Sequence, residues 1–127
     1  MNTGSQGSMT PVELQRAVAS ETVTWAHDDL DLGYREIGLA LEADERTVRR
    51  WAGREIAPRG HHREKLAELR ELRELLAAVF EEEPAGHAWL HSSVRAFSGR
   101  TPISLIRRGE VEKVVEVLAT IESGAFL

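Results

Sequence analysis

The sequence predicts an all-α protein. Apolar residues recur at intervals of three and four through most of the chain, which is the period of a helix. No segment alternates apolar and polar residues as a half-buried strand does, and no tight hairpin dipeptide is present. We therefore expect an N-terminal helix-turn-helix bundle joined by a long helix to a small C-terminal helical domain.

The composition narrows the class of protein further. A chain of 127 residues has room for one compact domain or for two small helical lobes that share a core. Cysteine is absent, which excludes disulfides and thiolate metal sites. No apolar run approaches the length of a membrane span, and no charged-then-apolar leader opens the chain. We expect a cytoplasmic protein with no membrane partner.

The N-terminal part predicts three helices. Residues 1–9 are small and polar, and we interpret them as a disordered tail or tag remnant. The segment from Thr10 to Glu13 is a capping-box pattern with proline at the first helical position. An acidic stretch over 27–33 breaks this helix, and a second helix follows from Tyr34. Asp44 is a good N-cap for a third, so residues 10–63 form the expected helix-turn-helix domain.

A longer helix is expected from His61 to Glu82, ended by Pro84 and Gly86, and residues 64–83 of it form the connecting segment. Its leucines recur at short intervals and cover a wide face rather than the narrow seam of a coiled coil. A wide apolar face suits a spine that contacts other helices on two sides, with dimerisation as a possible addition.

The C-terminal domain, residues 84–127, predicts two further helices. Thr101 and Pro102 repeat the cap-then-proline start, and Gly109 ends that short helix. The segment from Glu110 to Glu122 carries valines, a leucine and an isoleucine on one face, and Gly124 stands in the usual position after its end.

The net charge of −5 is unevenly distributed. Residues 46–63 hold six arginines and a single acid, Glu55, while the flanking segments 1–45 and 64–83 are acidic. A polyanion such as nucleic acid would bind to this local basic segment, whatever the net charge of the whole chain.

This basic segment coincides with a helix-turn-helix pattern over 34–53, in which Gly38 is the small residue at the helix crossing. The pattern resembles that of Xre-like regulators, although Glu42 stands where many such motifs carry a glycine.

Operator DNA is the partner that this pattern predicts. Arginines on the second helix can pair with guanine or grip phosphates, and proteins of this kind usually read two half-sites as homodimers. The alternative is that these charges only solvate a surface helix. The expected DNA-binding residues are Glu45, Arg46, Thr47, Arg49, Arg50, Arg54 and Arg59.

No pattern indicates an enzyme, a metal site or a cofactor. His87 and His91 are four residues apart, but Ala88 occupies the place of the glutamate in a zinc-protease motif. Neither a phosphate-cradling loop nor a nucleophile elbow occurs. We expect a binding protein without catalytic residues, metal or cofactor.

The C-terminal half resembles the toxin-binding domain of the Xre/MbcA/ParS antitoxins. The resemblance is carried, in order, by Trp89-Leu90, Gly99-Arg100-Thr101-Pro102, Leu105-Ile106, Gly109 and a final helix ending in Ile121-Glu122-Ser123-Gly124. With the helix-turn-helix upstream, it extends from about Asp31 to Leu127. The chain departs from the family over residues 91–98, which read HSSVRAFS where the family often carries an asparagine-proline stretch.

The resemblance implies the antitoxin of a type II toxin–antitoxin system. Such a protein binds a RES-domain, NAD-consuming toxin encoded by the adjacent gene, near its active site, and represses its own operon. Carried over position by position, the resemblance implies these toxin-binding residues: Arg100, Arg107, Arg108, Ser123, Gly124, Ala125, Phe126 and Leu127. Trp89 is interpreted as a core anchor.

Two other functions remain open at this point. One is a free-standing transcriptional regulator whose C-terminal half binds a small molecule or another protein. The other is an inhibitor whose helix-turn-helix does not bind DNA.

Overall fold

The computed structural model describes residues 8–124, which form seven α-helices, one 3-10 helix and no strand. The all-α prediction is confirmed. None of these described helices is both long enough and apolar enough to cross a membrane. In chain order the elements are α1 (Pro11–Asp28), α2 (Tyr34–Leu41), α3 (Glu45–Ala52), α4 (His61–Val79), α5 (Glu83–Leu90), η1 (Arg95–Phe97), α6 (Pro102–Arg107) and α7 (Val111–Glu122).

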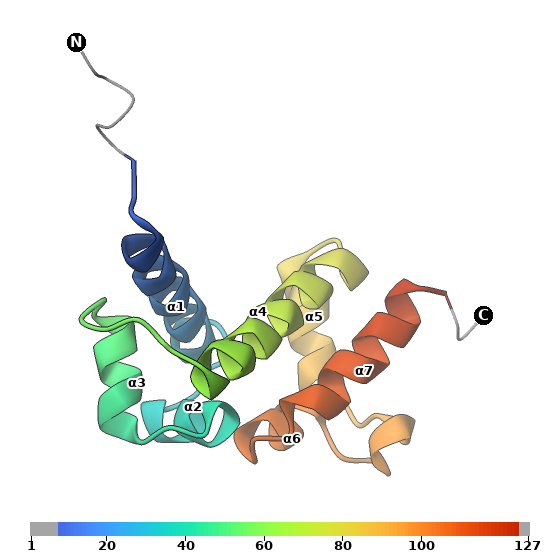
Figure 1. Cartoon of the computed structure of the whole chain (residues 1–127). Helices are drawn as coiled ribbons and strands as arrows, with labels where there is room; N and C mark the ends of the chain where they lie inside the picture. The colour runs from blue at the N-terminus through green and yellow to red at the C-terminus, as the bar shows by residue number, and fades with distance from the viewer. Residues whose placement is uncertain (1–7, 125–127) are drawn as a thin grey trace.

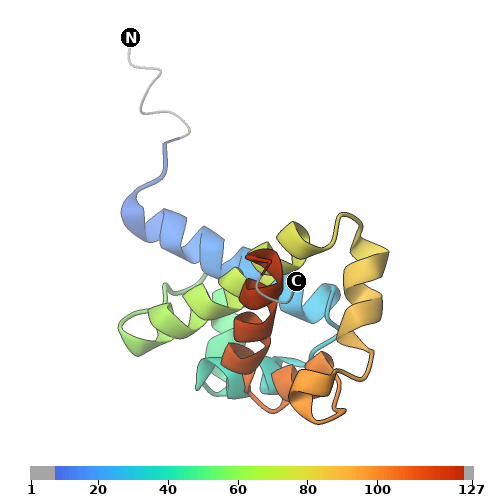
Figure 2. The same ribbon diagram turned by 90° about the vertical axis from the view of Figure 1, so that its right-hand side faces the viewer.

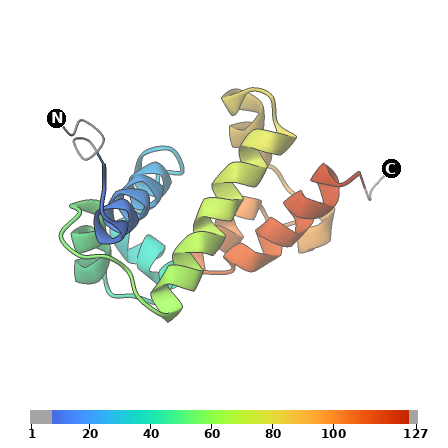
Figure 3. The same cartoon turned by 45° about the horizontal axis from the view of Figure 1, so that its top comes forward.

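Helix α4 occupies the middle of the molecule. Helices α1, α2 and α3 lie on one side of it, and α5, α6 and α7 lie on the other (Figures 1 and 3). Its buried leucines are Leu66, Leu69 and Leu72, and α7 is the helix that packs most extensively against it. One apolar cluster runs from Val23 of α1 through these leucines to Leu118 of α7. The two sides of the molecule therefore share a core.

The start of α1 follows the predicted capping box. The Thr10 hydroxyl accepts a hydrogen bond from the Glu13 amide at 3.1 Å, and the Glu13 carboxylate accepts one from the Thr10 amide at 3.3 Å. Two amides that the helix itself cannot satisfy are thereby paired. Figure 2 shows these first turns at the edge of the molecule, where Val12 and Leu14 are exposed.

His27 makes two contacts that hold the link between α1 and α2 in place. Its Nδ1 atom lies 2.8 Å from the Leu32 carbonyl oxygen, and its ring stacks on Tyr34 with 4.2 Å between the centroids. Because both contacts cross the acidic break at 27–33, they fix where α2 begins relative to the end of α1.

The predicted end of the long helix was wrong. Helix α4 ends at Val79, Phe80 takes an extended backbone, and Pro84 lies in the first turn of α5 rather than ending α4. Proline is favoured there because its missing N–H would have no helical partner. Gly86 is buried inside α5, and a Cβ built on it would lie 3.4 Å from the Phe80 ring. This glycine therefore lets the ring pack against α5.

Gly109 brings the two sides of the molecule into backbone contact. Its φ is +82°, and a Cβ built on it would lie 2.9 Å from the carbonyl oxygen of Leu39 in α2. A side chain is thus excluded both by the left-handed backbone and by lack of space. Beside this contact, Arg107 of α6 lies 3.8 Å from Glu36 of α2.

We predict that Gly109→Ala lowers the free energy of unfolding by about 2–4 kcal/mol, because it adds an overlap with α2 to the backbone strain. Gly99→Ala is the matched control, since Gly99 has φ +85° but its nearest neighbour, the Ser93 hydroxyl oxygen, would be 3.5 Å away. This variant is expected to lose about 1 kcal/mol. Urea denaturation measures both, and equal losses would contradict the close approach of Gly109 to α2.

Candidate functional site

Helices α2 and α3 are joined by residues 42–44 and pack closely against each other. A Cβ on Gly38 would overlap the carbonyl oxygen of Ala43, so the crossing requires a glycine, as the sequence predicted. The buried side chains Ile37, Leu41, Val48 and Trp51 hold the pair together. The geometry is that of two short helices fixed around a tight turn.

Glu42 takes the conformation that a glycine has in many such turns. Its φ of 56° and ψ of 44° are left-handed. The first two turns of α4 hold it there. The Glu42 carboxylate lies 2.7 Å from His61 Nε2 and 3.3 Å from Lys65 Nζ, and the Glu42 carbonyl oxygen lies 3.1 Å from His62 Nε2. Hydrogen bonds from His61 and Lys65 lower the pKa of Glu42.

The first turn of α4 also reaches α3. The His62 ring lies edge-on to Trp51, with 5.1 Å between centroids, and Trp51 is fully buried. The N-terminal residues of α4 therefore fix both the turn at Glu42 and helix α3, which follows that turn. Sequence reasoning missed this contact, because nothing in the local pattern pairs Glu42 with residues about twenty positions later.

Asp44 starts α3 as predicted. Its carboxylate accepts a hydrogen bond from the Thr47 amide at 2.7 Å, and this bond lowers the pKa of Asp44. Thr47, a predicted DNA contact, is half-buried beside the cap.

The remaining candidates on α3 share its exposed face. Arg49 pairs with Glu45 at 2.8 Å and lies over the Tyr34 ring at 4.7 Å, while Arg50 lies 3.7 Å from Glu55. Arg46 has no ion pair to any residue of 8–124, and the same holds for Arg59 beyond the end of α3. This face thus offers arginines that are unpaired or held only by exposed pairs, which contribute little.

Arg54 lies apart from this face. Its φ is +59°, and it lines a small hollow of about 360 Å³ together with Glu21 and Asp28 of α1 and Asp29, which follows that helix. These acidic neighbours make Arg54 the weakest of the predicted DNA contacts.

The C-terminal candidates fall into two groups. Arg100, Arg107 and Arg108 are exposed near α6; Arg100 Nε donates to the Phe97 carbonyl at 3.2 Å, and Arg108 lies 3.5 Å from Glu110. Ser123 and Gly124 lie at the other end of α7, which is about 18 Å long at 1.5 Å per residue. The structure therefore does not bring the two groups together.

Ser123 and Gly124 end α7 with hydrogen bonds. The Ser123 hydroxyl donates to the Thr120 carbonyl at 2.9 Å, and the Gly124 amide donates to the Ile121 carbonyl at 3.0 Å. Gly124 stands after the end of α7 as predicted, and its φ of +78° is left-handed, as is common for glycine at that position. The other predicted toxin contacts, Ala125, Phe126 and Leu127, lie outside the described residues.

His87 of α5 and His91, which follows that helix, form a pair rather than a larger cluster. The rings of His87 and His91 lie 4.6 Å apart between centroids. Within residues 8–124, no group of three or more histidine, aspartate or glutamate side chains is arranged to hold a metal ion.

Comparison with known proteins identifies the family. Residues 75–124 match the model of the antitoxin Xre/MbcA/ParS C-terminal toxin-binding domain. The mycobacterial cidal antitoxin MbcA of Mycobacterium tuberculosis is 31% identical over 110 residues, covering 87% of this chain and 96% of that protein.

The chain belongs to the Xre/MbcA/ParS antitoxin family.

Two further relatives agree. A probable mycobacterial cidal antitoxin of M. tuberculosis is 28% identical over 91% of this chain and 98% of its own length. In the crystal structure of the M. tuberculosis MbcT–MbcA toxin–antitoxin complex, one chain is 30% identical and superposes with a TM-score of 0.55, covering 85% of this chain and 96% of that one.

Several of the residues that mark this chain as an Xre/MbcA/ParS antitoxin serve the fold. The Thr101 hydroxyl accepts from the Ser104 amide at 3.2 Å to cap α6, and Pro102 occupies its first turn. Gly109 permits the approach of α2. Trp89 is half-buried with its ring 5.7 Å from Phe80, so it anchors α5 to the end of α4.

The segment 91–98, where this antitoxin departs from the family pattern, closes on itself. The Val94 amide donates to the Arg100 carbonyl at 3.1 Å, and the Gly99 amide donates to the Val94 carbonyl at 3.0 Å. The Ser93 hydroxyl also donates to the Gly99 carbonyl. A compact loop is thus built without the asparagine-proline stretch.

Proposed function

We propose that this chain neutralises a RES-domain, NAD-consuming toxin encoded by the adjacent gene, by binding near the toxin's active site. The observation that carries the proposal is the similarity to MbcA over nearly the whole of both chains, together with the complex in which MbcA is assembled with MbcT. The RES class of the toxin follows from the family resemblance. The chain acts in the cytoplasm by binding alone, with no catalytic residue, metal or cofactor of its own.

The proposed toxin-binding surface comprises the end of α7, residues 123–127, with Arg100, Arg107 and Arg108 as further contacts. Family resemblance supports this choice. The exposure of the three arginines and of Ser123 agrees with it, because none is needed inside the core.

We further propose that the antitoxin represses its own operon by binding operator DNA as a homodimer. The exposed face of α3 is the proposed DNA contact, with Arg46, Arg49 and Arg50 at its centre. Support comes from the concentration of arginines in a chain that is otherwise acidic and from their exposure on a helix fixed by Gly38 and Trp51.

We expect Arg46→Ala together with Arg49→Ala to weaken operator binding at least about a hundredfold and to flatten its salt dependence, because base and phosphate contacts are lost. Both side chains are exposed, so the far-UV circular dichroism spectrum should not change. Arg70→Ala with Arg95→Ala removes the same charge from exposed positions outside α3 and should bind like the unmodified chain. If operator affinity survives loss of Arg46 and Arg49, α3 is not the recognition helix.

A chain that lacks residues 123–127 should no longer rescue the growth of a host expressing the toxin, while its operator affinity stays unchanged. The truncation begins after the last residue of α7, so no buried side chain of the described core is removed. A chain lacking residues 1–7 is the control and should rescue growth. Rescue by the chain without 123–127 would place the toxin contact elsewhere.

A further inference from the structure

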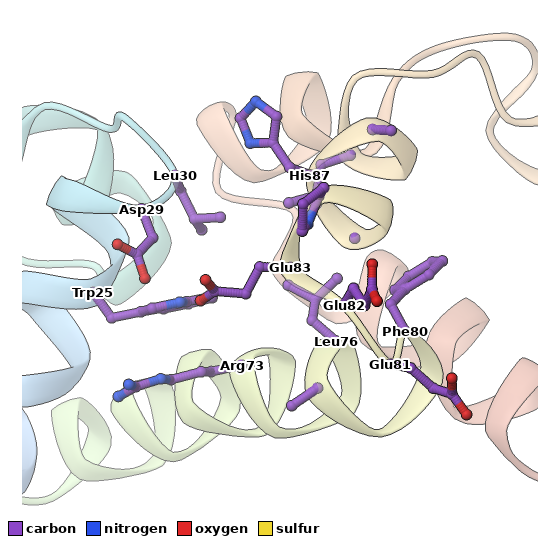
Figure 4. Close-up of a pocket in the computed structure, with 15 residues that line it drawn as sticks. Trp25, Asp29, Leu30, Arg73, Leu76, Phe80, Glu81, Glu82, Glu83 and His87 are labelled. Atoms are coloured by element: carbon purple, nitrogen blue, oxygen red, sulfur yellow. The ribbon is translucent and has the colours of Figure 1, made fainter.

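A groove of about 770 Å³ lies between the end of α1, the second half of α4, and α5 (Figure 4). Its apolar wall includes Trp25, Leu30, Leu76 and Phe80. Gly86 contributes bare backbone beneath the Phe80 ring. Neither the proposed DNA surface on α3 nor the proposed toxin contacts at α6 and the end of α7 include any of these residues.

The rim of the groove is acidic. Asp29 just after α1, Glu81 and Glu82 just before α5, and Glu83 at its start line it. None of these carboxylates makes an ion pair with any residue of 8–124. Figure 4 shows the Glu83 side chain extending across the groove towards Trp25 and Asp29. Among the described residues of the lining, Arg73 is the only arginine or lysine, and its guanidinium lies over the Trp25 ring at 5.8 Å.

This combination selects a particular ligand chemistry. Unpaired carboxylates repel nucleic acid and other anions. An apolar wall with an aromatic ring can instead pack against the aliphatic part of a lysine or arginine side chain, while its charged group pairs with the carboxylates of the rim. The contact between Arg73 and Trp25 is an example of that packing within the chain itself.

We propose that the groove docks a basic, partly apolar segment of the toxin, as a second contact besides the end of α7. The assignment rests on the proposed antitoxin function. The toxin is the favoured source because every lining residue on α5, and those on α4 from Leu76 onward, fall within the matched toxin-binding region 75–124. Residues 1–7 and 125–127 contain no lysine or arginine, so these residues do not supply the complementary side chain.

The test measures the affinity of the full-length antitoxin for the purified product of the adjacent toxin gene, by isothermal titration calorimetry at low and high salt. Asp29→Asn, Glu82→Gln and Glu83→Gln combined should weaken binding by about tenfold and reduce its salt dependence. Glu64→Gln, Glu71→Gln and Glu74→Gln combined remove the same charge from exposed positions of α4 outside the groove, and should change little.

Arg73→Gln should change the affinity for the toxin in the opposite direction. It removes the one arginine of the groove, so the toxin should bind a few-fold more tightly, an effect that damage to the fold would not produce.

The outcomes separate the two proposals. Toxin binding that is equal in the groove variant and its control overturns the groove assignment and leaves the antitoxin function standing. An unmodified chain that does not bind the toxin overturns both. A groove variant that changes only the self-association of the antitoxin, measured by analytical ultracentrifugation, would assign the groove to a second copy of this chain and overturn the toxin assignment.

Discussion

The structure depends on the apolar face of α4. Leu66, Leu69 and Leu72 are buried in a single cluster to which helices on both sides contribute, and α7 covers α4 more extensively than any other helix does. Each fully buried leucine stabilises the fold by about 1.5–3 kcal/mol relative to exposure, so this one helix anchors both halves of a small protein. The short helices α2, α3, α5 and α6 have 6–8 residues each, too few to be stable alone, and they take their positions from this core.

The two ends of α4 contact different candidate surfaces. Its first turn holds Glu42 and Trp51, and thereby the orientation of α3. Its last turns, with Phe80, form one wall of the acidic groove. One packed body would therefore present the proposed DNA-binding surface on α3 and, through different residues, the proposed toxin contacts in the groove, near α6 and at the end of α7. Gly109 against Leu39 gives the two sides a second contact that does not pass through α4.

The sequence predicted those features that depend on local rules. The capping box at Thr10, the glycine at the α2–α3 crossing, and the starts of α3 and α6 follow from residue types at fixed spacing, and the structure contains each of them. Pro84 shows the limit of such rules, because proline marks the end of one helix and the start of another equally well. The position of Phe80 against Gly86, which decides between the two, is a tertiary contact.

For the candidate site, the exposed arginines of α3 could be predicted from helical spacing. The contacts of Glu42 with His61 and His62 could not be predicted, because these partners lie about twenty residues away in the sequence. Its charge predicts Arg54 as a DNA contact, yet a left-handed backbone places it beside acidic residues in α1 and just after it.

The separation of the two surfaces is tested most directly by a gel-shift titration with operator DNA, antitoxin and toxin together. We predict a ternary complex: toxin added to the antitoxin–DNA complex should shift the band further, because the proposed DNA contacts on α3 share no residue with the proposed toxin contacts. Release of free DNA at stoichiometric toxin would contradict separate surfaces, and failure of the antitoxin to bind either partner would contradict the proposed function itself.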